Sequence, residues 1–250
     1  LVAQLKGEKS NSIMGWFGQC YPLSGIDNDR YVDFTKKMFL EHLEGADEAL
    51  NFFSTLQLGF SRFSVEKANI PKEVLDNTPD PIKAELEKGL AEGTIIESTT
   101  THNIYNEEGQ VIGERKFYKD EMESEGTKKA IELSGPIFNS LNKGWTLIID
   151  ELDAKLHPLL TRNIVLLFMD PEKNKHGAQL IFATHDTNLL DLDIIRRDQI
   201  WFAEKDKVES TDIYSLVEFK DEEGKKIRND RDIKRDYIRG RYGAIPFIGK

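Results

Sequence analysis

Two carboxylates and a histidine follow closely after two short apolar segments of the sequence. Asp150 and Glu151 come after the run Leu147–Ile149, and His185 follows a second run at 179–183. A helical segment separates the runs, which predicts two parallel strands joined by a crossover helix. Ligands bind beyond the carboxyl ends of the strands in such sheets. The three side chains therefore predict a phosphoryl-transfer site of the kind that nucleotide hydrolysis uses.

Each of these residues has a distinct expected role in that chemistry. Asp150, the first residue out of the strand, is placed to hold Mg²⁺ directly or through water. Glu151 would act on the attacking water as a general base or orienter, and His185 would donate to the terminal phosphate. Taken singly, acids after a strand are common helix caps, and a histidine at a strand end is usually structural. Their joint order favours the site.

The elements that must position these residues form an α/β unit. We expect a strand at 145–150, a helix that begins at Pro158 and a returning strand at 178–184. Before them, Ser124-Glu125-Gly126 reads as a turn that caps a helix extending to about residue 142. Pro136 lies inside that helix and is expected to kink or shorten it.

The first half of the chain shows a different pattern. Residues 1–68 read as mainly helical, because apolar residues recur at steps of three and four. Turn residues predict a linker at 70–81 and a short helix at 82–90. Further strands are predicted at these positions: 94–105 and 110–118 as a hairpin, then 199–204 and 211–219.

The composition is that of an ordinary soluble protein. It has 250 residues, a formal net charge of −10 and 39% hydrophobic content, with apolar runs far too short to span a bilayer. The acidic balance argues against general coating of nucleic acid, although residues 225–241 are locally basic and could meet phosphates or an acidic partner. The single cysteine, Cys20, fits a reducing compartment, and we expect a cytoplasmic protein without a membrane anchor.

The order of these motifs resembles the C-terminal half of ABC-type ATPases. The similarity is greatest to the bacterial AAA/ABC-hybrid, SMC- and OLD-like ATPases of phage-defence and abortive-infection systems. Five segments carry the resemblance: Glu123–Thr127, Asp150–Pro158, Gln179–Asp186, Arg196–Phe202 and Gly240–Pro246. It implies a P-loop NTPase lobe with a mostly parallel sheet flanked by helices at 123–250. Residues 1–122 would be a helical lid with a β-hairpin insertion at about 94–118.

The resemblance also implies a role for each motif residue. Asp150 would be the Walker B magnesium ligand, Glu151 the catalytic carboxylate and His185 the switch histidine. Signature and interface residues would contact ATP bound to the opposite protomer of a dimer: Ser124, Gly126, Thr127 and Asp153. A helix that starts near Thr127 would present amide groups to that phosphate. The implied cofactors are ATP and Mg²⁺.

One motif of the family has no counterpart in the printed sequence. No glycine-rich loop followed by Lys and Ser or Thr occurs in the 250 residues. In the family this Walker A loop lies near the N-terminus, so we expect the natural protein to be longer by an N-terminal lobe. We expect residues 1–250 alone to bind nucleotide poorly, and tight ATP binding in calorimetry would refute this.

Two other functions remain open from the sequence. A non-catalytic platform would dock a partner or toxin protein through the helical first half and the basic tail. A magnesium-dependent nuclease would use acid clusters at 150–153 and at Asp191-Leu192-Asp193. In the favoured interpretation, ATP hydrolysis by a homodimer switches a defence effector.

Overall fold

The structure is a computed structural model that describes residues 7–26, 29–92, 95–220, 227 and 231–245. The chain divides into two compact units, Leu1–Ala183 and Thr184–Lys250. Among the described residues, no helix is long and apolar enough to cross a membrane. The expected boundary between a lid at 1–122 and an ATPase lobe at 123–250 concerns function and stays a prediction.

A three-stranded parallel sheet lies in the first unit. Its strand order is β1 (Cys20–Ser24), β5 (Thr146–Asp150) and β6 (Gln179–Phe182). Helix α8 (Pro158–Met169) connects β5 to β6, which confirms the predicted crossover and the helix start at Pro158. Leu147 and Ile149 of β5 are fully buried, as expected for the middle strand of a covered parallel sheet.

The N-terminal segment departs from the predicted elements in two places. Residues 1–68, predicted as mainly helical, contain the helices α1 (Glu8–Phe17), α2 (Asp29–Leu40) and α3 (Ala46–Leu56), but also two strands that the periodicity does not predict, β1 and β2 (Arg62–Lys67). The expected linker at 70–81 contains a helix, α4 (Lys72–Asp76), and the next helix, α5 (Asp80–Glu92), begins within it. Pro22 is tolerated in β1 because β1 is an edge strand of the described sheet.

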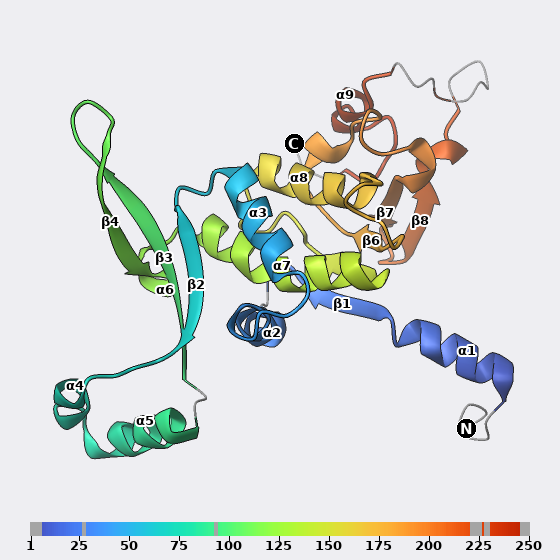
Figure 1. Ribbon diagram of the computed structural model, residues 1–250. Helices are drawn as coiled ribbons and strands as arrows, with labels where there is room; N and C mark the ends of the chain where they lie inside the picture. Colours follow the sequence, from blue (N-terminus) through green and yellow to red (C-terminus); the bar gives the residue numbers. More distant parts are fainter. Residues whose placement is uncertain (1–6, 27–28, 93–94, 221–226, 228–230, 246–250) are drawn as a thin grey trace. The chain divides into compact units, whose positions relative to one another are not determined.

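The predicted hairpin is present and belongs to a larger sheet. Strands β3 (Ile96–Tyr105) and β4 (Val111–Tyr118) pair antiparallel, and β2 pairs with the other edge of β3. Figure 1 shows β3 and β4 as a long arm with a loop at its tip. Phe39 of α2 packs edge-on against Phe63 of β2, with ring centroids 4.9 Å apart, so α2 and this sheet share a core. The short helix α6 (Lys119–Met122) leads from β4 towards the next helix.

Helix α7 (Glu125–Lys143) continues through Pro136 and is not shortened by it. A proline at 136 has no N–H to donate to the carbonyl of Glu132, four residues earlier. The hydroxyl of Thr35 on α2 donates to this carbonyl at 2.6 Å instead. Gly135 permits the close approach, because a Cβ there would lie 2.3 Å from Thr35 Oγ1. Helix α2 therefore supplies the hydrogen bond that the proline removes.

The second unit contains a two-stranded antiparallel sheet, β7 (Trp201–Lys205) and β8 (Thr211–Ser215), and helix α9 (Ile233–Ile238). This confirms two strands near the predicted positions, although β8 ends at Ser215 and a 3-10 turn follows at Leu216–Glu218. The Phe202 ring stacks on Tyr237 and Tyr242, which forms an aromatic core. Parts of the basic segment 225–241 and of the motif 240–246 lie outside the described residues.

Candidate functional site

Asp150 and Glu151 lie at the carboxyl end of β5, beside the end of β1. Ser24 is the register partner of Asp150, and the Gly25 amide donates to the Asp150 carbonyl at 2.6 Å. Glu151 has a φ of 54°, in the left-handed region that residues other than glycine seldom adopt. A Cβ at position 25 would lie 1.9 Å from the Glu151 carbonyl oxygen. Gly25 is therefore required for this arrangement of the two strand ends.

Backbone hydrogen bonds hold the loop after Glu151. The amide of Leu152 donates to the carbonyl of Ala183 at 3.0 Å, and the Leu152 side chain is fully buried. The carbonyl of Asp153 accepts from the amide of Leu156 at 3.0 Å. Lys155 has a φ of 63°, a second left-handed residue in the same loop. Leu152 thus anchors the loop, while Asp153 and Lys155 shape the turn that follows.

Ser124 caps the N-terminus of α7, which confirms the helix cap predicted from Ser124-Glu125-Gly126. Its Oγ accepts from the Thr127 amide at 3.1 Å and lies 2.9 Å from the Thr127 hydroxyl. Glu125 begins the helix, and Gly126 follows in its first turn. The cap satisfies one of the amides that a helix leaves unpaired at its start.

The structure brings this helix start together with the loop after β5. A Cβ at position 126 would lie 3.2 Å from the Lys155 carbonyl oxygen, so the two backbones nearly touch. The Glu125 carboxylate also pairs with Lys155 Nζ at 3.0 Å. The motif residues Ser124, Gly126 and Thr127 therefore share one region with the loop that carries Asp153. In the sequence, most of helix α7 and strand β5 separate these two motifs.

His185 belongs to the second compact unit, at an exposed position. The neighbouring Asp186 amide donates to Thr184 Oγ1 at 3.0 Å, and the Asp186 carboxylate caps a short 3-10 turn by accepting from the Asn188 amide at 2.9 Å. In the same unit, Asp191 Oδ1 accepts from the Asp193 amide at 3.0 Å. This pair of acids therefore forms a local turn. No group of three or more potential metal-binding side chains occurs within the described part of the chain.

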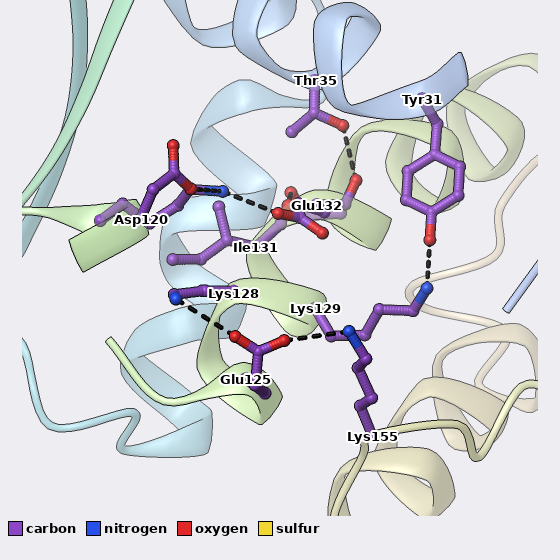
Figure 2. Close-up of polar contacts among 11 residues, drawn as sticks. Tyr31, Thr35, Asp120, Glu125, Lys128, Lys129, Ile131, Glu132 and Lys155 are labelled. Carbon is purple, nitrogen blue, oxygen red and sulfur yellow. Dashed lines mark hydrogen bonds and ion pairs between the residues drawn. The ribbon is translucent and has the colours of Figure 1, made fainter. Parts of the chain in front are cut away.

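Further along α7, the buried side chains of Lys129 and Glu132 have polar partners on other elements (Figure 2). The Glu132 carboxylate accepts from Lys119 Nζ at 2.7 Å, and Lys119 is only 2% exposed. Burial alone would lower the pKa of Lys119, but its hydrogen bonds to Asp120 and Glu132 outweigh burial and raise the pKa above 10.5. Lys129 is equally buried and donates to the Tyr31 hydroxyl. These contacts fix α7 against α2 and α6.

The residue before Ser124 is tied to the antiparallel sheet. The Glu123 carboxylate is almost fully buried and lies 2.7 Å from His102 Nε2 on β3. The Thr100 hydroxyl, on the same strand, donates to the same carboxylate oxygen. The position of Ser124 is therefore connected to β3 through its immediate neighbour.

Several of these residues could not be found from sequence patterns. Gly25 follows a five-residue strand that contains a proline, a weak signal that the helical periodicity of residues 1–68 obscured. The Lys119–Glu132 and Tyr31–Lys129 pairs join residues that are distant in the sequence or on different elements, so no local pattern marks them. In the sequence, Glu123 stands out only as the first residue of the Glu123–Thr127 motif.

A parallel sheet flanked by helices, with carboxylates after its central strand, is the arrangement found in P-loop nucleotide hydrolases. A family model described as "AAA domain, putative AbiEii toxin, Type IV TA system" matches residues 62–191, just over half of the chain. The chain belongs to this AAA-domain family. This confirms a P-loop ATPase of the abortive-infection and toxin–antitoxin type, with an α/β fold and nucleotide binding as its general activity. A search of curated proteins finds no match.

Proposed function

We propose that the protein hydrolyses ATP in the manner of ABC-type ATPases and uses hydrolysis to switch a defence effector. The observation that carries the proposal is the end of β5. Asp150 and Glu151 leave a parallel sheet there, and Gly25 fits the left-handed backbone of Glu151. Backbone strain of this kind persists where the surrounding structure imposes it, and it concentrates at functional sites.

The donor set at this end of the sheet fits a magnesium ion. Mg²⁺ is usually bound by one or two carboxylates, with water and phosphate oxygens completing its shell. Asp150 is exposed at the strand end, so its carboxylate is accessible to an ion there. When bound, the ion would neutralise charge on the phosphate oxygens. Asp150 is the residue that would hold it.

The remaining residues would act on water and phosphate. Glu151 would orient the attacking water and accept its proton, because it follows the metal-binding carboxylate directly. Ser124, Gly126 and Thr127 would bind the terminal phosphate of a nucleotide held by a second protomer, with Asp153 at the interface. His185 would donate to the terminal phosphate of the nucleotide on which Glu151 acts, and would respond to the loss of that phosphate. These roles rest on the resemblance of the motifs to ABC-type ATPases.

ATP turnover by the complete protein tests the metal role. We expect Mg²⁺-dependent turnover that chelation abolishes and that Asp150→Asn reduces. Asp198→Asn, which changes an exposed acid paired with Arg196 in the second unit, serves as the control. Turnover that is insensitive both to chelation and to Asp150→Asn would overturn the magnesium site.

Mixing two inactive variants tests the two-protomer arrangement. Ser124→Arg would damage the phosphate contact given to the partner, whereas Glu151→Gln would damage the chemistry of the protomer's own nucleotide. A mixed dimer would contain one site with intact Ser124 and intact Glu151, so mixing should restore part of the turnover. A mixture no more active than either variant alone would contradict shared sites.

A second candidate function, a platform for a partner protein, has an observation in its favour. Apolar side chains are exposed near the tip of the β3–β4 arm, namely Ile104, Tyr105, Val111 and Ile112. Exposed apolar groups of this kind are common at interaction sites. Replacing Val111 and Ile112 by Ser should abolish effector switching while leaving ATP turnover intact. Unchanged switching would remove the support for this function.

A further inference from the structure

A small pocket lies beside the start of α7, and lysine side chains dominate its lining. Its residues come from α7, from the loop after β5 and from the residue after Gly25: Ile26, Glu125, Lys128, Lys129, Glu132 and Lys155. The pocket measures about 110 Å³. A cavity needs roughly 10–15 Å³ to hold one water molecule, so this one can hold several waters or a tetrahedral anion.

The two carboxylates in the lining differ in how firmly they are held. Glu132 is buried and accepts from Lys119, which lies outside the pocket, so it is part of the fixed interior. The Glu125 side chain is 62% exposed and bridges two lysines, with Oε1 3.2 Å from Lys128 Nζ and Oε2 3.0 Å from Lys155 Nζ. Figure 2 shows Glu125 reaching towards Lys128 from one oxygen and towards Lys155 from the other.

The Glu125 bridge is weak enough to be exchanged for a ligand. Exposed ion pairs contribute little to stability, because water and salt screen them. The two lysines hold the pKa of Glu125 below its usual value, through hydrogen bonds to Lys155 and then Lys128, so the carboxylate is ionised at neutral pH. A phosphate group carries more charge than a carboxylate and offers three acceptor oxygens. It can therefore replace Glu125 between the same two ammonium groups.

We propose that this pocket binds a phosphate group through Lys128 and Lys155, and that Glu125 is an internal anion that competes with it. The buried Lys129, held by the Tyr31 hydroxyl, adds positive charge to the pocket wall without having to move. Binding would free the Glu125 side chain and break its link to Lys155. Occupancy of the pocket would thus loosen the contact between the start of α7 and the loop that carries Asp153.

The proposal concerns binding and does not depend on hydrolysis at Glu151. Titration of the chain with inorganic phosphate, followed by calorimetry or by NMR of the lysine side chains, tests it. Glu125→Gln should tighten phosphate binding by roughly threefold to tenfold, the range that one or two exposed ion pairs are worth. Lys128→Gln and Lys155→Gln should weaken it by a similar factor. A parallel titration with ATP shows whether a nucleotide supplies the phosphate, through a larger response than inorganic phosphate gives.

Matched variants separate this site from general charge effects. Glu108→Gln, in the β3–β4 turn, and Lys67→Gln, on β2, make the same charge changes away from the pocket, and both residues are exposed. These controls should leave phosphate binding unchanged. The proposal is overturned if Glu125→Gln does not tighten binding, or if Lys155→Gln weakens it no more than Lys67→Gln. A failure of the ATPase proposal would appear in turnover and leave these titrations unaffected.

Discussion

Helix α7 carries two networks of lysine and glutamate that use the same chemistry in different surroundings. Glu132 and Lys119 are buried, and their ammonium and carboxylate groups lie 2.7 Å apart. Glu125, Lys128 and Lys155 pair over longer distances near the surface. Loss of its partner costs a buried charge several kcal/mol of free energy, roughly 3–5. An exposed charge can exchange its partner for water or a ligand at little cost in free energy. The buried network therefore holds the architecture, and the exposed network is free to respond.

The largest expected effect comes from breaking the buried pair. Lys119→Met removes the ammonium group that donates to the buried Glu132 carboxylate, so it should lower the free energy of unfolding by about 3–5 kcal/mol. Urea unfolding measures the change. Adding Glu132→Leu to Lys119→Met should recover part of the loss. Lys83→Met, which breaks the exposed pair with Asp76, is the control, and an equal effect there would erase the contrast between buried and exposed pairs.

The next effect concerns the hydrogen bond that substitutes for the missing amide of Pro136. Thr35→Val removes the hydroxyl that donates to the Glu132 carbonyl and should cost about 1–3 kcal/mol. In a Pro136→Ala background, the alanine amide can donate to that carbonyl, so Thr35→Val should cost less. Thermal unfolding of the four proteins gives the comparison. Equal costs in both backgrounds would show that Thr35 does not compensate for the proline.

In the second unit, burial changes the ionisation of a tyrosine at alkaline pH. Burial, followed by the nearby Asp236 carboxylate, raises the pKa of Tyr242 to about 12 from the ordinary 10.0. A pKa raised on folding adds stability that is complete below pH 10 and is lost as the pH rises towards 12. Tyrosinate absorbance should thus show late-ionising groups, one of which Tyr242→Phe removes. Titration of this group near pH 10 in the folded protein would contradict the burial argument.

The smallest effect is expected at the exposed network. Glu125→Gln should change the free energy of unfolding far less than Lys119→Met does, because the Glu125 carboxylate is 62% exposed and water and salt screen its ion pairs. Urea unfolding at low and high salt measures it, with Glu108→Gln as the control. A loss comparable to that of Lys119→Met would mean that Glu125 is a structural residue, and would remove the reason to treat it as an exchangeable group.

The sequence predicts the elements whose pattern is local, and it misses those that depend on distant contacts. The β5–α8–β6 crossover follows from apolar runs and Pro158, and the hairpin follows from its turn residues. β1 is short, contains Pro22, and becomes a strand only because it pairs with β5. The continuity of α7 depends on Thr35, which is remote in the sequence. The lysine pocket likewise forms only when the loop after Glu151 returns to the start of α7.

We propose that Glu151 is the catalytic carboxylate of an ATPase. The most direct measurement compares ATP turnover by the complete protein with that of Glu151→Gln. Glu209→Gln is a matched control, because Glu209 is also a glutamate in a left-handed conformation, in the turn between β7 and β8. We predict that Glu151→Gln lowers turnover by about 10²–10⁴-fold, while Glu209→Gln leaves it unchanged. Turnover by Glu151→Gln at the unmodified rate would contradict the assignment.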